Sequence, residues 1–277
     1  MKYAFFGTPE FAAIILEKLI KAGMPPALVV CNPDRPIGRK RIITPPPVKA
    51  RIMNQESGIR DRIKIIQPEK LEIRNWELEI EKLGGIDFAI VAAYAKIIPK
   101  NIIDTLPAKF LGVHPSLLPK YRGATPIQSA ILNGEKKTGV TLFLIDEKVD
   151  HGQILVNKES RIMNNESSES LHDRLAELGA DLLIETLPKF VNGEIKPQTQ
   201  NEAEASYTKK FETEDAFVDL EKDDPDVVMR KINALNPEPG VYTIRDGKRV
   251  KILAAELKDG KLKLTRIQEA GGMAKAV

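Results

Sequence analysis

Two acid–base side chains, His114 and Asp150, follow strand-like runs of the sequence. Apolar residues 110–113 precede the histidine, and apolar residues 138–145 precede the segment that carries the aspartate. Ligands of open α/β sheets bind beyond the carboxyl ends of the strands, so we expect both side chains at that edge. A carboxylate beside an imidazole favours the charged imidazolium, which can stabilise an oxyanion and then transfer a proton. On residue type alone, however, a lone histidine is more often structural.

Motifs for several other chemistries are incomplete. The turn at residues 7–10 lacks the G-x-G-x-x-G spacing of a dinucleotide site, so we expect no NAD. Ser116 lacks the G-x-S-x-G pattern of a hydrolase nucleophile. His151 has no H-E-x-x-H or comparable spacing around it, so we expect no metal. Cys31 is the only cysteine, which excludes an internal disulfide and a cysteine-rich metal site.

The elements that position these residues alternate between strand and helix. Apolar runs predict strands at 3–6, 27–31, 63–66, 86–92, 110–113, 138–145 and 153–156. Helical spacing predicts helices at 10–22, 48–56, 76–83 and 168–191. This alternation is typical of a parallel sheet covered on both faces. We therefore predict an α/β catalytic domain over residues 1–191, with a Rossmann-like, mostly parallel sheet and helices on both faces.

The composition changes at residues 192–205, which are polar, contain Gly and Pro and show no periodicity, so we interpret them as a linker. Residues 206–277 then form the second predicted domain. Asp-Gly turns at 246–247 and 259–260 separate strand-like runs, which is a strong hairpin signal. We predict a small β-rich domain, an open, OB-like β-barrel, with strands at 241–245, 249–256 and 261–268.

Positive charge gathers in two segments, although the net charge is only +3. Residues 34–51 contain six cations and one acid, and residues 245–266 contain eight cations and three acids. The first segment is a Pro-rich loop on the same predicted rim as His114, and a cationic arm there suits a phosphate-bearing substrate. A solvated charged surface is the alternative interpretation of both segments.

Cellular location is indicated by composition. No apolar run approaches the roughly 20 residues of a membrane span, and the apolar N-terminus has no cleavage signal. A single cysteine fits a reducing compartment. We expect a cytoplasmic monomer with no membrane association.

Successive segments resemble the motifs of the methionyl-tRNA formyltransferase family. In the first domain these are FFGTPEFA (5–12), NPDRPIGRKR (32–41), AAYAKIIP (92–99), HPSLLPKYRGATPIQ (114–128) and DEKVDHGQIL (146–155). The second domain continues the resemblance with ASYTKK (205–210) and NALNPEPGVYT (233–243). The SLLP-x-x-RG-x-x-P pattern is typical of folate-dependent formyltransferases generally, whereas FGTPEF and PDRP-x-GR resemble the tRNA enzyme.

The resemblance implies transfer of the formyl group of 10-formyltetrahydrofolate to the amino group of methionyl initiator tRNA, for translation initiation. It implies that His114 and Asp150 are catalytic. The implied folate-binding residues are Ala93, Tyr94, Ala95, Ile97, Ser116, Leu117, Leu118, Pro119, Phe143 and Asp146, with the pterin held by backbone groups. The implied tRNA-binding residues are Arg35, Arg39, Lys40, Arg41, Lys248 and Arg249.

Gly112 departs from the family pattern, which has a catalytic asparagine two residues before the histidine. We expect a water to occupy the vacated space, or Gln128 to reach into it. Gly112→Asn is expected to fit and to raise the rate. Two other functions stay open: formyl transfer to an amino-sugar nucleotide, and catalytically weak tRNA binding.

Overall fold

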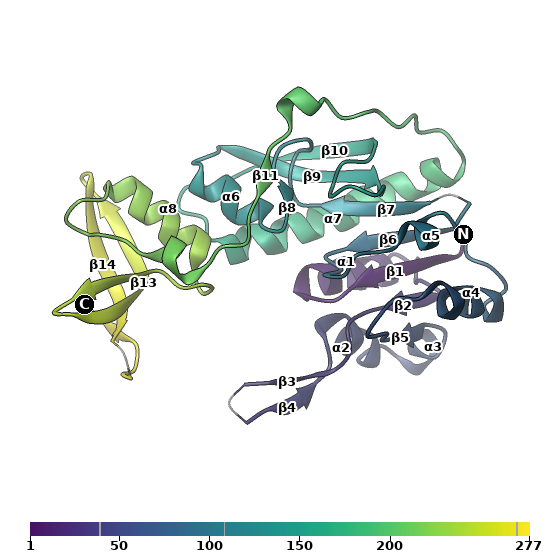
Figure 1. Cartoon of the computed structure of the whole chain (residues 1–277), viewed down its shortest axis with the longest axis horizontal. Coiled ribbons are helices and arrows are strands. Elements are labelled where there is room, and N and C mark those ends of the chain that lie inside the picture. Colours follow the sequence, from purple (N-terminus) through teal and green to yellow (C-terminus); the bar gives the residue numbers. More distant parts are fainter. Residues whose placement is uncertain (39, 108, 270) are drawn as a thin grey trace. The chain divides into compact units, whose positions relative to one another are not determined.

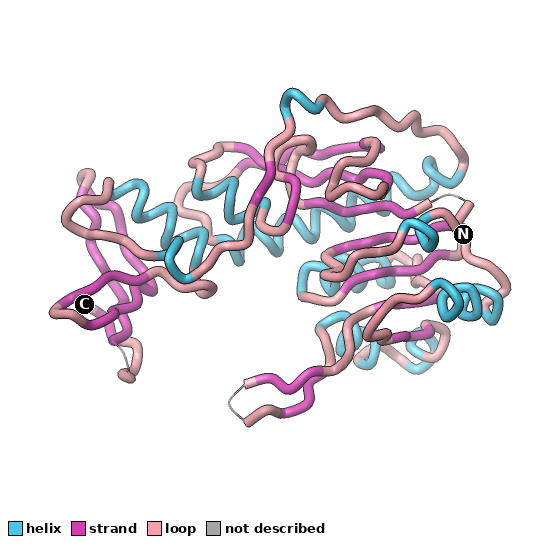
Figure 2. Tube along the Cα trace, viewed as in Figure 1, coloured by secondary structure: helices cyan, strands magenta, loops and turns pink. Residues whose placement is uncertain are grey.

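The computed structural model describes residues 1–38, 40–107, 109–269 and 271–277, which Figure 2 colours by secondary structure. The chain divides into two compact units. The first unit comprises Met1–Lys120, Gly139–Glu159 and Asp173–Ala205, and the second comprises Tyr121–Thr138, Ser160–His172 and Ser206–Val277. The predicted boundary at residues 192–205 stays a prediction.

A seven-stranded sheet forms the core of the first unit (Figure 1). Its strand order is β10-β9-β7-β6-β1-β2-β5. The strands from β5 to β7 pair in parallel, while β9 runs antiparallel to β7, so the predicted mostly parallel sheet is confirmed. The bounds are β1 (Tyr3–Gly7), β2 (Leu28–Val30), β5 (Lys64–Ile66), β6 (Phe88–Ala92), β7 (Phe110–His114), β9 (Lys137–Leu144) and β10 (Ile154–Arg161).

Helices cover both faces of this sheet because its strands are apolar on both sides. Phe6 packs against Trp76 of α4 on one face, with ring centroids 5.4 Å apart. On the other face Phe88 contacts Phe190 of α7 edge-to-face at 5.9 Å. The helices are α1 (Glu10–Lys21), α2 (Pro47–Met53), α3 (Ser57–Arg60), α4 (Ile73–Lys82), α5 (Lys100–Ile103) and α7 (Ser168–Val191).

The basic segment predicted as a loop instead contains a two-stranded antiparallel ribbon, formed by β3 (Arg35–Ile37) and β4 (Ile42–Thr44). Gly38 (φ 70°) and Arg41 (φ 49°) adopt the left-handed backbone in the connection between the strands. Ile37, Ile42 and Ile43 are each about three-fifths exposed, so the ribbon has side chains suited to strands but adds nothing to the core.

The second unit contains an antiparallel sheet of order β12-β13-β14-β15, as expected from the two Asp-Gly turns. Both residues of each turn are left-handed, which is the geometry of a type I′ hairpin. Helix α8 packs against this sheet and was not predicted, although Asp224 caps it and Pro225 begins it. The bounds are β8 (Arg122–Gly123), α6 (Pro126–Leu132), β11 (Tyr207–Thr208), α8 (Pro225–Leu235), β12 (Tyr242–Arg245), β13 (Lys248–Lys258), β14 (Lys261–Glu269) and β15 (Lys275–Ala276).

Candidate active site

His114 and Asp150 lie side by side in the first unit. His114 is the last residue of β7 and is 5% exposed, and its Nδ1 lies 3.5 Å from Oδ2 of Asp150. The aspartate belongs to the loop between β9 and β10 and is about four-fifths buried. At this distance the carboxylate can orient the imidazole ring.

The backbone around Asp150 is tightly held. Asp150 has a left-handed backbone (φ 49°), which is uncommon for a residue other than glycine. The Gln200 side-chain amide donates to the carbonyl oxygens of Asp150 (2.9 Å) and Gly152 (2.8 Å). A β carbon at Gly152 would overlap the Leu144 carbonyl, so only glycine fits there. Sequence reasoning missed Gln200 because it lies in the segment interpreted as a linker.

Gly112 pairs with Phe143 across β7 and β9, and the aromatic ring fills the space beside the glycine. A β carbon built at Gly112 would overlap the ring edge, and the phenylalanine is only 4% exposed. The expectation that asparagine fits here without another change was therefore wrong. The obstacle is the contact with the Phe143 ring and not the backbone conformation, because Gly112 is not among the described glycines with a left-handed backbone. Gln128, the other candidate for the space, lies on α6 in the second unit.

The segment after His114 is fixed by a buried polar network. The Ser116 hydroxyl donates to the Lys120 carbonyl at 2.6 Å. Thr141 donates its hydroxyl to the Ser116 carbonyl (2.7 Å) and accepts from the Leu118 N–H (3.1 Å). These groups are engaged within the protein, so any folate contact in this segment falls more readily to Leu117 and Pro119.

The segment after β6 offers backbone rather than side-chain contacts. Ala93 has a left-handed backbone (φ 47°), and such strain is often found at ligand sites. The Tyr94 ring turns inward against Phe6, with ring centroids 5.3 Å apart, and burial raises its pKa to about 12. Ala93 and Ala95 are exposed, and Ile97 is 92% exposed. A planar ligand with a polar edge can therefore approach this backbone.

A second group of acid–base side chains adjoins the His114–Asp150 pair in the sequence. His151 Nδ1 lies 2.6 Å from Oδ2 of Asp146, and its Nε2 lies 3.6 Å from Oε1 of Glu202. The other Asp146 oxygen accepts from the Lys148 N–H at 2.9 Å. Both oxygens of the Asp146 carboxylate therefore bind groups of the loop between β9 and β10 and stabilise its conformation. Among the described residues, no group of three or more His, Cys, Asp or Glu side chains could hold a metal ion.

The cations of the basic segment differ in how they are engaged. Lys49 on α2 lies 2.8 Å from Asp34, and this hydrogen bond holds the pKa of the Asp34 carboxyl below its usual range. Arg51 pairs with Glu10 and Glu17 of α1, so these two cations stabilise the fold. The remaining candidates lie on the ribbon: Arg35, which pairs with Glu69 at 2.6 Å, and the exposed Lys40 and Arg41. Arg39 lies outside the described residues.

The two basic residues singled out on β13 also differ. Lys248 is exposed. The Arg249 guanidinium carbon lies 3.7 Å from the centre of the Tyr242 ring, a cation–π contact within the sheet. Lys248 is therefore the freer candidate for a phosphate contact.

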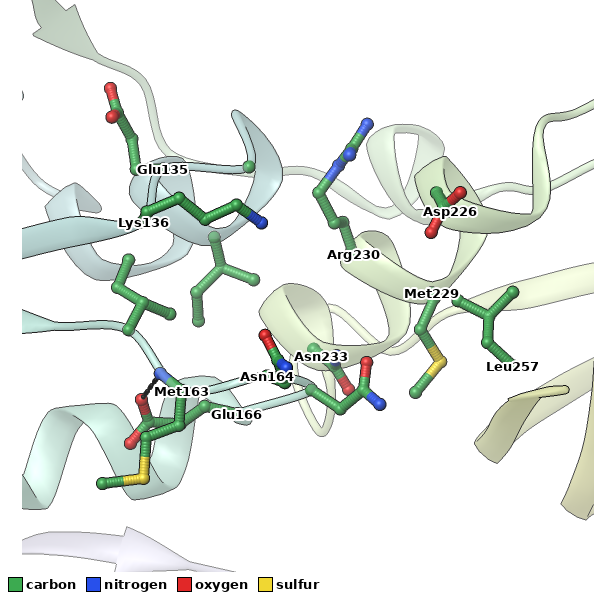
Figure 3. Close-up of a pocket in the computed structure, with 14 residues that line it drawn as sticks. Glu135, Lys136, Met163, Asn164, Glu166, Asp226, Met229, Arg230, Asn233 and Leu257 are labelled. Carbon is green, nitrogen blue, oxygen red and sulfur yellow. Dashed lines mark hydrogen bonds between the residues drawn. The ribbon is translucent and has the colours of Figure 1, made fainter. Parts of the chain in front are cut away.

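The second unit has a separate groove of about 360 Å³ between the α6 end and α8 (Figure 3). Arg230 and Lys136 belong to its lining, and the Arg230 Nε is buried without a hydrogen-bond partner among the described residues. Its lining also carries the carboxylates of Glu135, Glu166 and Asp226. This mixed charge favours neither an anion nor a cation.

Comparison with known families defines the class of the chain. Residues 1–187 match the formyl transferase model, and residues 210–274 match the formyl transferase C-terminal domain model. Both parts of a formyltransferase are therefore present in order, and the chain is an enzyme of that class.

Relatives narrow the class further. The methionyl-tRNA formyltransferase of Bacillus licheniformis is 38% identical over 257 residues, which cover 92% of this chain and 78% of the relative. That of Halorhodospira halophila is 36% identical over 295 residues, covering 98% of this chain and 92% of the relative. The chain belongs to the methionyl-tRNA formyltransferase family.

Solved structures share the fold. The methionyl-tRNA formyltransferase of Clostridium thermocellum has a TM-score of 0.62 at 16% identity, covering 97% of this chain and 98% of that one. An N-formyltransferase from Helicobacter canadensis, in complex with folinic acid and dTDP-3-aminofucose, has a TM-score of 0.65 at 21% identity, covering 94% and 88%. HypX from Aquifex aeolicus, in complex with tetrahydrofolic acid, has a TM-score of 0.67 at 20% identity, covering 100% and 46%.

As for membranes, none of the helices within the described residues is both long enough and apolar enough to cross a bilayer.

Proposed function

We propose that this chain transfers the formyl group of 10-formyltetrahydrofolate to the amino group of methionine on initiator tRNA. The observation that carries the proposal is the match to methionyl-tRNA formyltransferases over more than nine-tenths of the chain. The contact between His114 and Asp150 supplies the acid–base pair that such a transfer needs.

Both reactants are substrates, and the transfer needs no covalent bond to the protein. As the amine nitrogen bonds to the formyl carbon, protonated His114 donates to the oxygen that gains negative charge. Asp150, whose carboxylate lies 3.5 Å from the ring, orients the imidazole. The bond from the formyl carbon to the folate nitrogen then breaks, and an ordered water carries the amine proton to that leaving nitrogen.

Gly112 changes how the oxyanion is held. The amide that the family places there is absent, and the Phe143 ring occupies the adjoining space. Removing one such donor typically costs about 100- to 1000-fold in rate. We therefore propose that His114 is the principal donor in this chain and that transfer is slower than in relatives with the amide.

The folate site that we propose follows the strand ends of the first unit. Backbone groups of residues 93–97 and 143–146 hold the pterin, and residues 116–119 close the site. The exposed positions of Ala93, Ala95 and Ile97 support this arrangement. So do the tetrahydrofolic acid and folinic acid complexes of proteins that share the fold.

The tRNA contacts that we propose are the basic residues of the β3–β4 ribbon and of β13. Exposed Lys40, Arg41 and Lys248 support the proposal, since exposed cations can pair with phosphates. We propose that Arg35 and Arg39 contact tRNA together with the other cations of the ribbon. We propose that Arg249 does so beside Lys248. Residues 206–277 are thereby a domain that contacts tRNA.

One assay tests the proposed function against its alternatives. Purified protein is given 10-formyltetrahydrofolate with charged initiator tRNA, and in parallel with amino-sugar nucleotides, because a formyltransferase of similar fold was solved with such a nucleotide. Formyl transfer to the tRNA supports the proposal. Transfer to a sugar nucleotide alone contradicts it. Binding of tRNA without formyl transfer also contradicts it and would support a tRNA-binding function instead.

A further inference from the structure

Residues 198–202 lie along the start of β10 and the loop that carries Asp150, entirely within the first unit. Gln198 and Ile154 exchange two backbone hydrogen bonds, each 2.8 Å long. Gln200 then binds the loop through its side chain, and Glu202 faces His151. Gln198 therefore contacts the start of β10, and Gln200 and Glu202 contact the loop before it. The segment thus supports the loop.

The Gln200 amide is placed to hold one particular backbone conformation. Its nitrogen has two hydrogens, and its two bonds reach the carbonyls of Asp150 and Gly152. The first of these carbonyls belongs to Asp150 itself, whose backbone is left-handed (φ 49°). Such a conformation in a non-glycine residue persists when its surroundings hold it. Gln200 is itself 6% exposed, so water competes little for its hydrogen bonds.

We infer that Gln200 is a positioning residue for catalysis: it holds Asp150 in the left-handed conformation that presents the carboxylate to His114. This inference rests on the proposed function, because it assigns Gln200 a role through the acid–base pair. Without the amide, the Asp150 backbone relaxes toward ordinary conformations, and the carboxylate turns away from the imidazole. Gln200 touches neither reactant, so its loss should affect the chemical step more than binding.

The kinetic test compares Gln200→Leu with Gln198→Leu. Gln198 is an exposed glutamine of the same segment that bonds to Ile154 of β10 through its backbone alone, so it is a matched control. We expect Gln200→Leu to lower kcat at least tenfold, with KM for tRNA and folate within about twofold. Gln198→Leu should change neither. In an Asp150→Ala background, Gln200→Leu should cause no further loss, because two residues that act as a unit are non-additive.

A second readout does not depend on activity. The 15N signals of the His114 ring, recorded by NMR at fixed pH, report its contact with Asp150. Gln200→Leu should move these signals toward their positions in Asp150→Ala, whereas Gln198→Leu should leave them in place. Gln200→Glu, which keeps the size but loses the paired donors, should repeat the result if the leucine variant fails to fold.

The outcomes separate this inference from the proposed function. If the parent protein transfers no formyl group to tRNA, the proposed function fails, while the NMR signals still decide whether Gln200 positions Asp150. Two results would overturn the inference in an active enzyme: unchanged kcat with unchanged His114 signals, or an equal loss from Gln200→Leu in the Asp150→Ala background.

Discussion

The ring of Phe143 occupies the space into which a side chain at Gly112 would point, across the β7–β9 pair. The glycine and the aromatic ring are thus a size-matched pair two residues before His114. The family resemblance implies an asparagine at this position, and the Phe143 ring fills the space that its side chain would enter. Changing only one of these two residues should therefore disturb the packing of the β7–β9 pair and lower the stability of the protein.

Gly112→Asn alone should therefore destabilise the protein. Overpacking a buried site typically costs about 1–3 kcal/mol. For a protein of this size we expect the melting temperature to fall by several degrees, since about 1 kcal/mol corresponds to roughly 2–4 °C. Formyl transfer should not become faster. Thermal unfolding and steady-state transfer on the same preparation check both expectations.

The double variant Gly112→Asn with Phe143→Met should behave differently. Methionine is flexible and can leave room for the amide. We expect part of the stability to return and transfer to exceed that of Phe143→Met alone, which is the matched control. A double variant slower than that control would show that an amide at this position does not help this enzyme.

If the cations of the β3–β4 ribbon contact tRNA, their removal should change how tRNA binding depends on salt. Replacing Arg39, Lys40 and Arg41 with Ala should weaken tRNA binding and flatten its dependence on salt. The slope of log K against log salt should fall by about 0.7–0.9 for each phosphate that the protein no longer neutralises. Folate affinity should barely change.

A control for the ribbon variant removes three other exposed cations of the first unit, Arg62, Lys70 and Arg74. It alters the net charge equally but lies outside the ribbon. If both triple variants show the same salt slope, the ribbon contributes only through overall charge.

The buried thiol of Cys31 should react slowly with thiol reagents in the folded protein. Burial raises the pKa of its thiol to about 12, above the roughly 8.5 of an unfolded cysteine. The folded state therefore holds the thiol proton more tightly. The resulting stability is fully present below about pH 8.5 and is lost as pH rises toward 12. At about pH 8 a thiol reagent should label the native protein only through unfolding, and faster as urea is added. Labelling of native protein at the rate of free cysteine would contradict this.

The sequence predicted the alternating elements well because each central strand is fully apolar and each long helix has a clear apolar face. Partners across the sheet were not predictable in the same way. The sequence alone does not show that the space beside Gly112 is filled, because that depends on the strand register that places Phe143 opposite it. Gln200 lies in a polar segment without periodicity, and its importance depends on a contact 50 residues away in the chain. Helix α8 carried an Asp-Pro start signal that the acidic composition obscured.

The central claim is that His114 and Asp150 act together in formyl transfer. The most direct measurement is the single-turnover rate from 10-formyltetrahydrofolate to charged initiator tRNA, for the parent, His114→Ala and Asp150→Ala, with tRNA binding measured alongside. We predict that each variant loses most of the transfer, by roughly 100-fold or more, while tRNA affinity stays within about twofold. Near-parental transfer in either variant would contradict the account.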